Sequence, residues 1–287
     1  METLLIDSHC HLDLLGAIRH SGGVDAVLDQ ARASGVHGML NACVSLKAYQ
    51  TIRDLLRAYS GIWGSVGVHP NQRLVREPEE AELLVLAEEP KVVAIGETGL
   101  DYYRMKVGRE QQQTRFRRHI AVAKAGGKPL IVHCREALAD VLRILGEEEG
   151  DEIGGVIHCF VGDWDEAQYA MDFNFYISFS GIVTFENTSA LQEVAVRTPL
   201  DRLLVETDCP YLTPLPERGK PNQPAFVRLV SEHVARLRGV PFAEIAIATT
   251  ENFFRLFRAA SPASMRIGLP PYLQPFCTTR MARSSFS

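Results

Sequence analysis

The chain has 287 residues, with 30 basic side chains against 35 acidic ones and a formal net charge of −5 when histidine is neutral. Hydrophobic residues make up 46% of the sequence and charged residues 23%, which is close to the average of soluble globular proteins and excludes fibrous and disordered classes. No apolar stretch is long enough to span a membrane, and the first residues do not resemble a secretory signal. We therefore expect a cytoplasmic protein that makes no membrane contact.

Apolar segments alternate with amphipathic ones along most of the chain. Eight short apolar segments are predicted to be strands, at residues 4–8, 36–41, 62–68, 92–96, 129–133, 154–158, 175–179 and 202–206. The segments between them have the i, i+3, i+4, i+7 spacing of helices, as in Ile52, Leu55, Leu56 and Tyr59. Eight strand–helix units in about 240 residues are what a closed barrel requires. We predict an α/β fold, a (β/α)8 TIM barrel of the metal-dependent hydrolase type.

The end of the chain changes character. Two helices, near 224–238 and 241–258, are predicted to cover the closing strand and the barrel floor. After Ala260 the sequence SPASMRIGLPPYLQPFCTTRMARSSFS has no sustained period and contains Pro-Pro and Ser-rich stretches. We therefore expect a single catalytic barrel domain over 1–260 and a poorly ordered extension over 261–287.

Six residues with metal-binding side chains stand at or just beyond the ends of predicted strands. They are His9, His11, Glu97, His133, His158 and Asp208. Taken singly, a histidine in this place is more often a hydrogen-bonded structural residue, and an aspartate a turn or helix cap. In a barrel, however, the carboxyl ends of all strands meet at one face, where active sites are built. Six such residues on five strands therefore predict a functional site.

The residue types favour transition metals. Because residues i and i+2 of a strand share a face, His9 and His11 point inward together and Cys10 points outward. Four imidazoles and two carboxylates suit zinc, manganese, cobalt or iron better than calcium or magnesium, although magnesium remains an alternative. They exceed the three protein ligands of one catalytic ion. Two divalent ions bridged by a carboxylate would use all six.

Several motifs together resemble the TatD family of metal-dependent deoxyribonucleases, which have amidohydrolase-type barrels. The similarity runs from about Ile6 to Phe257. The motifs are DSHCHLD at 7–13, GVHP at 67–70, IGETGLDYY at 95–103, PLIVHCR at 129–135, HCFVG at 158–162 and LVETDCPYL at 204–212. The resemblance implies that His9, His11 and Asp208 hold one ion, that His133 and His158 hold the other, and that Glu97 bridges them. His69 is often followed two residues later by a second histidine in the family, but Asn71 stands there in this chain.

The site residues also have expected roles. A carboxylate that touches both an ion and the attacking water can act as a general base or orient the water, so Asp208 is the candidate, with pure ligation as its alternative. Glu206, deeper in the strand, is expected to be structural or to support a ligand. Candidates for substrate contact are His69, Arg104, Arg135 and Tyr102, with Tyr103 or Tyr211 as alternative stacking residues.

These expectations favour a two-metal hydrolase, and specifically a TatD-type deoxyribonuclease that cleaves phosphodiester bonds from DNA ends. We expect these ends to be single-stranded. The net charge of −5 argues against tracking along duplex DNA, which needs many phosphate contacts. No obligate protein partner is implied. One alternative is a hydrolase of a lactone, cyclic amide or aminoacyl ester on the same site. Related barrels often bridge their ions with a carbamylated lysine, and no lysine stands at a strand end here. A second alternative is a binding protein that kept the metal site without turnover.

Overall fold

The protein is described by a computed structural model over residues 3–15 and 22–277. Eight parallel strands follow one another in chain order in a single sheet, which forms the near-closed barrel that the sequence predicts. The strands are β1 (Leu5–Cys10), β2 (Val36–Asn41), β3 (Ile62–Val66), β4 (Val92–Asp101), β5 (Leu130–Arg135), β6 (Gly155–Ile157), β7 (Phe175–Phe179) and β8 (Leu203–Val205).

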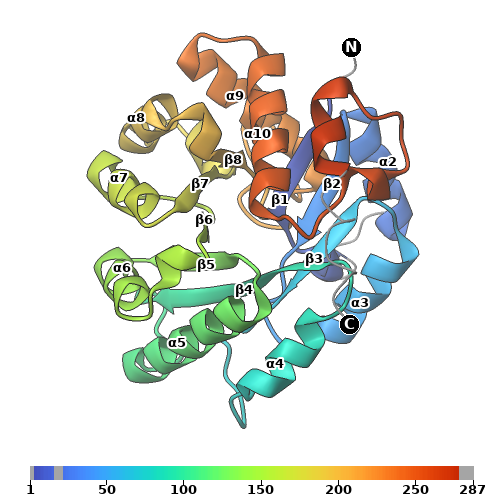
Figure 1. The fold of residues 1–287 in the computed structure, drawn as a ribbon. Coiled ribbons are helices and arrows are strands. Elements are labelled where there is room, and N and C mark those ends of the chain that lie inside the picture. Colours follow the sequence, from blue (N-terminus) through green and yellow to red (C-terminus); the bar gives the residue numbers. More distant parts are fainter. Residues whose placement is uncertain (1–2, 16–21, 278–287) are drawn as a thin grey trace.

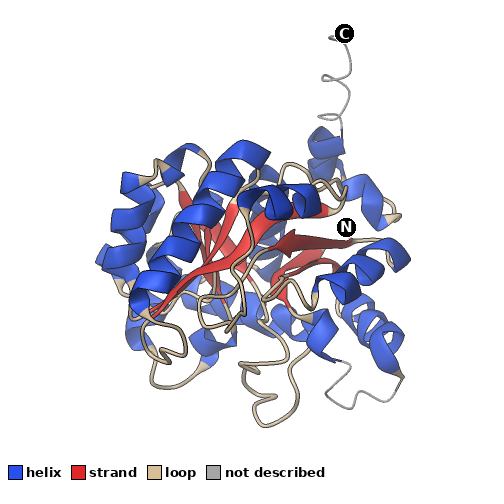
Figure 2. Ribbon diagram, turned by 90° about the horizontal axis from the view of Figure 1, so that it is seen from below, coloured by secondary structure: helices blue, strands red, loops and turns tan. Residues whose placement is uncertain are grey.

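Helices surround the barrel, as Figure 1 and Figure 2 show from two directions. They are α1 (Leu12–Leu15), α2 (Gly23–Ala33), α3 (Tyr49–Ala58), α4 (Glu80–Ala87), α5 (Arg109–Gly126), α6 (Leu138–Glu147), α7 (Trp164–Asp172), α8 (Ser189–Arg197), α9 (Val227–Arg238) and α10 (Phe242–Leu256). Within the described ranges, no helix has the length and apolar character needed to cross a membrane.

Strand β4 is longer than the sequence predicts. The predicted strand ends at residue 96, whereas β4 continues to Asp101 with an irregular register between Ile95 and Thr98. Beyond this irregularity, β4 pairs again with β5, and Asp101 lies opposite Arg135. Because β4 reaches this far, it carries two acidic side chains to the carboxyl end of the barrel.

The first and last strands meet through side chains as well as backbone. The buried carboxylate of Asp7 accepts hydrogen bonds from the backbone N–H (2.9 Å) and the hydroxyl (2.5 Å) of Thr207. Burial raises the pKa of Asp7 to about 8, although the bonds from Thr207 oppose this rise. Just beyond, the N–H of Asp208 donates to the carbonyl of His9 at 2.9 Å. This seam fixes β1 and the segment after β8 in register with each other.

The amino end of the barrel is closed by an aromatic floor on α10. The ring of Phe253 lies 5.3 Å from that of Trp63 and 4.9 Å from that of Phe257. All three side chains are at most 1% exposed. A second apolar layer lies between the strands and the surrounding helices. The floor therefore separates the interior of the barrel from solvent at one end and leaves the other end for chemistry.

Residues 261–277 pack on this floor, where the sequence predicts a poorly ordered extension. They form two 3-10 helices, η5 (Pro262–Met265) and η6 (Pro271–Cys277). Leu273 is fully buried, and the ring of Phe276 lies 6.1 Å from that of Phe254. The apolar side chains of this segment have no helical spacing in the sequence, but they are buried against residues that are distant in the chain. The remainder of the predicted extension, 278–287, lies outside the described residues.

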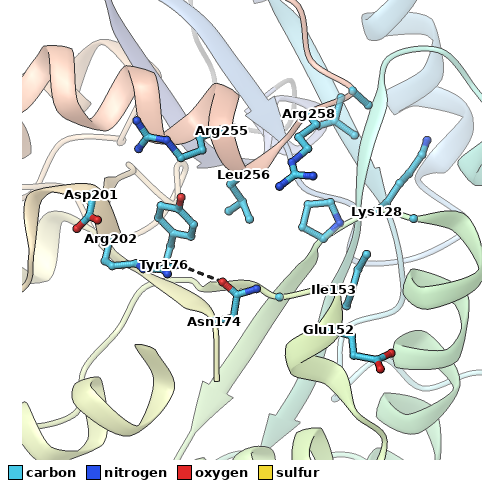
Figure 3. A pocket seen from close by; sticks show the side chains of 15 residues that line it. Lys128, Glu152, Ile153, Asn174, Tyr176, Asp201, Arg202, Arg255, Leu256 and Arg258 are labelled. Atoms are coloured by element: carbon cyan, nitrogen blue, oxygen red, sulfur yellow. Dashed lines mark hydrogen bonds between the residues drawn. The ribbon is translucent and has the colours of Figure 1, made fainter. Parts of the chain in front are cut away.

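A pocket of about 470 Å³ opens beside the floor, at the amino ends of β4 to β8 (Figure 3). Three of its basic side chains, those of Lys128, Arg202 and Arg255, are bound to protein acceptors. Lys128 donates to backbone carbonyls, including that of Val92, and Arg202 donates to Oδ1 of Asn174 at 3.1 Å. None of the six strand-end candidates lines this pocket. It lies at the end of the barrel opposite to them.

Leu273→Ala tests the packing of the C-terminal segment. We expect the free energy of unfolding to fall by about 2–5 kcal/mol, because the change leaves a cavity under η6. Urea denaturation followed by circular dichroism measures this loss. The control is Val85→Ala on α4, whose side chain is 66% exposed and which should change stability by about 0.5 kcal/mol or less. Equal stability of Leu273→Ala and wild type would contradict the packing.

Candidate metal centre

The six strand-end side chains converge around the carboxylate of Glu97. Its Oε1 lies 2.9 Å from Nδ1 of His133 and 3.0 Å from Nε2 of His158. Its Oε2 lies 3.5 Å from Nε2 of His9 and 3.7 Å from Nε2 of His11. Glu97 is only 3% exposed. One buried carboxylate thus stands between two pairs of imidazoles and turns one oxygen to each pair.

Asp208 adjoins the first pair. Its Oδ1 lies 3.3 Å from Nε2 of His11 and 3.7 Å from Nε2 of His9. The three side chains form a group whose potential ligand atoms all lie within 4.8 Å of one another. Cys10, between the two histidines, points the other way, and its thiol donates to the carbonyl of Leu40 at 3.4 Å. The alternation predicted for this strand is therefore present.

Two of the imidazoles are oriented by acceptors behind them. Nδ1 of His11 lies 3.1 Å from the carbonyl oxygen of Ala42, and Nδ1 of His158 lies 3.4 Å from Oε1 of Glu206. A hydrogen on Nδ1 then leaves the lone pair of Nε2 directed into the cluster, which is the arrangement typical of metal-binding histidines. Glu206 is fully buried and takes the supporting position that the sequence suggests.

His133 is oriented the other way round, by a residue that the sequence reasoning missed. Its Nδ1 faces Glu97, and its Nε2 lies 3.4 Å from Oδ2 of Asp101. The carboxylate of Asp101 is fixed in turn, because Oδ1 accepts the backbone N–H groups of Tyr103 (3.0 Å) and Arg104 (2.9 Å). Asp101 lies four residues after Glu97 on the same strand. That spacing would have revealed it, had the strand been predicted to continue past residue 96.

The charges of the cluster favour a bound cation. Burial alone would raise the pKa of Glu97, but the charge of His158 and hydrogen bonds from His133 and His158 hold it well below its usual range. Burial lowers the pKa of His11, yet the hydrogen bond that its ring donates to Asp208 and the charges of Glu97 and Asp208 raise it to about 9. The same negative potential that holds protons on these rings would attract a metal ion, which displaces protons on binding.

The arrangement of donor atoms also fits a metal. Nε2 of His9 lies 3.3 Å from Nε2 of His11, and Nδ1 of His133 lies 3.3 Å from Nε2 of His158. Two unprotonated ring nitrogens this close repel each other unless a proton or a cation lies near both. Imidazole and carboxylate donors suit zinc, manganese, cobalt and iron. Three groups of histidine and carboxylate side chains could each hold a metal ion, namely His9, His11 and Asp208, then His9, His158 and Glu206, and finally His69, Glu97 and His133.

Basic and aromatic side chains lie around the mouth of the cluster. The guanidinium of Arg135 lies 4.1 Å from the ring centroid of Tyr103, whose side chain is 58% exposed. Tyr211 is 55% exposed, and its ring lies 6.4 Å from that of His11. Arg104 is exposed on the segment after β4. A flexible anionic ligand that reaches the cluster would meet these groups first.

Tyr102, another predicted substrate contact, lies elsewhere. Its hydroxyl donates to Oδ2 of Asp140 at 2.7 Å and accepts from Gln113 at 2.8 Å. The guanidinium of Arg109 covers its ring at 4.2 Å. These contacts direct Tyr102 towards α5 and α6, and they do not bring it to the cluster. Its neighbour Tyr103 takes the exposed position instead.

His69 lies at the rim, on the segment between β3 and α4. Its Nε2 is 3.6 Å from Oε1 of Glu97, and its ring centroid is 4.4 Å from that of His133. Asn71 donates its backbone N–H to Nδ1 of His69 at 3.1 Å, and its Oδ1 accepts the N–H of Lys106 at 2.8 Å. Asn71 therefore orders this segment.

Asp101→Asn tests whether this carboxylate supports His133. The amide still accepts the two backbone N–H groups, but it removes the negative charge behind the imidazole. We expect zinc affinity to fall by about 10- to 100-fold, measured by competition with a chelating dye. Asp172→Asn, at an exposed site on α7, is the control and should bind zinc like wild type. Unchanged affinity in Asp101→Asn would refute the supporting role.

Comparisons with known proteins agree with this geometry. A family model described as TatD related DNase matches residues 6–258. An uncharacterized metal-dependent hydrolase of Escherichia coli, YcfH, is 50% identical over 255 residues, which is 88% of this chain and 95% of that protein. The 3'-5' ssDNA/RNA exonuclease TatD of Klebsiella pneumoniae is 36% identical over 239 residues, or 81% of this chain and 91% of that protein.

The fold is similar to that of a solved relative. The crystal structure of YJJV, a TatD homologue of Escherichia coli, superposes with a TM-score of 0.80 at 28% identity, covering 90% of this chain and 99% of that one. The family model spans nearly the whole barrel, and the six candidate ligands that the resembling motifs contain converge around Glu97. The chain therefore belongs to the TatD family of metal-dependent hydrolases.

Proposed function

We propose that the protein is a two-metal phosphodiesterase that removes nucleotides from the ends of single-stranded DNA. The observation that carries this proposal is the placement of Glu97, whose two oxygens face two different pairs of imidazoles. A carboxylate placed in this way suits a bridge between two cations. The 3'-5' ssDNA/RNA exonuclease name of the relative from Klebsiella pneumoniae supports the choice of substrate.

In this proposal each ion has its own set of ligands. His9, His11 and Asp208 would hold one ion, His133 and His158 would hold the other, and Glu97 would serve both. Divalent ions bound here would lower the pKa of water towards neutrality and offset the charge that develops on a phosphoryl group. The protein contributes a fixed set of donors, because acceptors behind His11, His133 and His158 hold their rings in place.

Asp208 is the residue to which we assign handling of the attacking water. Its side chain is 14% exposed, so it reaches the open end of the site, whereas Glu97 is buried beneath. An ionised carboxylate at this point orients the water and accepts its proton as the oxygen attacks phosphorus. Burial opposes ionisation, but hydrogen bonding to His11 and the charges of His11 and His9 lower the pKa of Asp208.

The mouth of the site supports a single-stranded substrate. Arg135 and Arg104 offer charge-assisted hydrogen bonds to phosphates, and Arg prefers this kind of bidentate contact. The exposed rings of Tyr103 and Tyr211 offer faces on which bases can stack without regard to sequence. These few contacts suit the end of a strand better than a long duplex, in keeping with the net charge of −5.

Glu97→Gln tests the bridge. The neutral amide cannot balance two cations held close together, so we expect metal content to fall from about two equivalents per chain to one or fewer. Nuclease activity should fall at least about 100-fold, which corresponds to about 2.7 kcal/mol of activation free energy. Elemental analysis after reconstitution and an assay with end-labelled DNA measure the two effects. Two retained ions and a wild-type rate would mean that Glu97 does not bridge.

Arg135→Ala tests the substrate class. We expect slower cleavage of end-labelled single-stranded DNA and unchanged metal content, because a phosphate contact is lost but no ligand is touched. Bis-p-nitrophenyl phosphate should still be hydrolysed, since it depends less on contacts outside the ions. Arg202→Ala is the matched control. Its guanidinium also lies over a tyrosine, Tyr176, at 5.3 Å, and both residues line the pocket at the amino end of the barrel, away from the cluster (Figure 3).

The same assays decide between the candidate functions. Wild-type protein reconstituted with manganese, cobalt or zinc should cleave the DNA and the small phosphodiester, and chelation should abolish both activities. A parallel panel of lactones, cyclic amides and aminoacyl esters should give little hydrolysis. Robust turnover of that panel with no phosphodiester cleavage would overturn the nuclease proposal. Absence of any hydrolysis by the metal-loaded protein would favour a binding protein instead.

A further inference from the structure

We propose that His69 is not a metal ligand and that its Nε2–H donates a hydrogen bond to a non-bridging oxygen of the scissile phosphate. The inference rests on the proposed phosphodiesterase function and adds to it a specific contact. His69, Glu97 and His133 form a group whose ligand atoms lie close enough to share an ion. Distance alone therefore does not distinguish a ligand from a substrate contact, but the hydrogen atoms of the ring do.

The backbone decides which nitrogen of His69 carries the hydrogen. The N–H of Asn71 points at Nδ1 of His69 with an N to N distance of 3.1 Å. A backbone N–H is always a donor, so Nδ1 must be the acceptor. A neutral imidazole has one donor and one acceptor. The hydrogen of neutral His69 is therefore on Nε2, and a nitrogen that carries a hydrogen has no lone pair with which to bind a metal.

Three other histidines of the cluster show the opposite arrangement. Behind His11 stands the carbonyl of Ala42, and behind His158 stands the carboxylate of Glu206. Each of these partners is an acceptor, which places the hydrogen on the outer nitrogen and leaves the inner one free for an ion. His133 follows the same rule, with Asp101 behind its Nε2. His69 alone among these four rings has a donor behind it.

The loop that carries His69 is firmly held. Arg115, only 1% exposed, donates from Nη1 to the carbonyl oxygens of His69 (2.7 Å) and Pro70 (2.9 Å). The guanidinium of Arg115 also pairs with Glu77. On the other side, the N–H of Val68 donates to a ring nitrogen of a buried histidine on α5 at 3.1 Å. The backbone geometry that fixes the hydrogen position of His69 is thus itself anchored.

Nε2 of His69 carries a hydrogen for which the cluster provides no acceptor. Oε1 of Glu97 lies 3.6 Å away, which is beyond hydrogen-bonding distance. Among the described residues, no hydrogen bond is formed by Nε2 of His69. The side chain is 22% exposed, so it is open to a ligand that enters from the mouth. A phosphate that lies across the cluster presents oxygens on this side, and a fixed N–H donor stabilises the charge that they gain in the transition state.

Nuclear magnetic resonance tests the tautomer directly. Protein labelled with 15N at histidine gives long-range spectra that distinguish Nε2–H from Nδ1–H rings, and comparison with His69→Gln assigns the His69 signal. We expect the Nε2–H pattern for His69 both without metal and after zinc is added. His11 should show an Nδ1–H pattern with zinc bound. An Nδ1–H pattern for His69 would overturn the inference. Loss of the hydrogen from Nε2 of His69 when zinc binds would overturn it as well.

Two variants then test the contact. His69→Gln retains an N–H donor near the position of Nε2, whereas His69→Ala removes it, and both should bind as much zinc as wild type. We expect DNA cleavage to fall about 100-fold in His69→Ala, the effect of removing one such donor, and less than about tenfold in His69→Gln. Titration calorimetry of zinc-loaded protein with inorganic phosphate should show weaker binding in His69→Ala and recovery in His69→Gln.

The outcomes separate this inference from the proposed function. Loss of zinc in His69→Ala would make His69 a ligand and refute the inference, even if wild type proves to be a nuclease. Equal phosphate binding in wild type and His69→Ala would also refute it. If wild type cleaves no phosphodiester, the proposed function falls. The spectra and the phosphate titration would in that case still decide whether His69 is a donor to bound phosphate.

Discussion

The carboxylate of Glu97 is the group on which the arrangement of the site depends, because each of its oxygens serves a different pair of imidazoles. Strand β4 can hold it there only by lying very close to its neighbours. A Cβ on Gly67 would stand 2.6 Å from backbone atoms of Gly96, and a Cβ on Gly99 would stand 2.2 Å from the carbonyl oxygen of His133. Gly99 also has a φ of +129°, which side chains rarely tolerate. Gly96 and Gly99, which lie on either side of Glu97 on β4, are therefore needed for the close packing that places its carboxylate.

The two ends of the barrel have separate tasks. Phe253, Phe257 and Trp63 seal the amino end, and residues 261–277 add to this apolar layer. The carboxyl end carries buried charged side chains, which specific polar partners hold in place. Asp101 is an example, because its carboxylate faces His133 and also accepts two backbone N–H groups of the segment that follows it. Stability is concentrated at one end and chemistry at the other, as is usual in barrels of this kind.

Sequence periodicity predicted all eight strands and the residues that converge, because burial imposes a regular pattern on strands and helices. The predicted strand ended at residue 96, whereas β4 continues to Asp101, and so Asp101 was missed. Beyond the end of β4, the backbone N–H of Tyr102 donates to the carbonyl of Arg135, whereas the guanidinium of Arg135 lies over the ring of Tyr103. The strand pattern gave no sign of which tyrosine ring would meet Arg135. Residues 261–277 were missed because their order comes from contacts with distant residues and not from local pattern.

The site is complete only when the first strand, β1, has met the segment that follows the last strand, β8. His9 and His11 come from the first strand, and Asp208 follows the last, with its N–H bonded to the carbonyl of His9. During synthesis the two histidines emerge long before their acidic partner. The group that they form with Asp208 exists only after almost the whole chain has been made and the barrel has closed. If this group holds an ion as proposed, all three ligands would be in place only in finished molecules, and a chain interrupted before β8 would lack the acidic one.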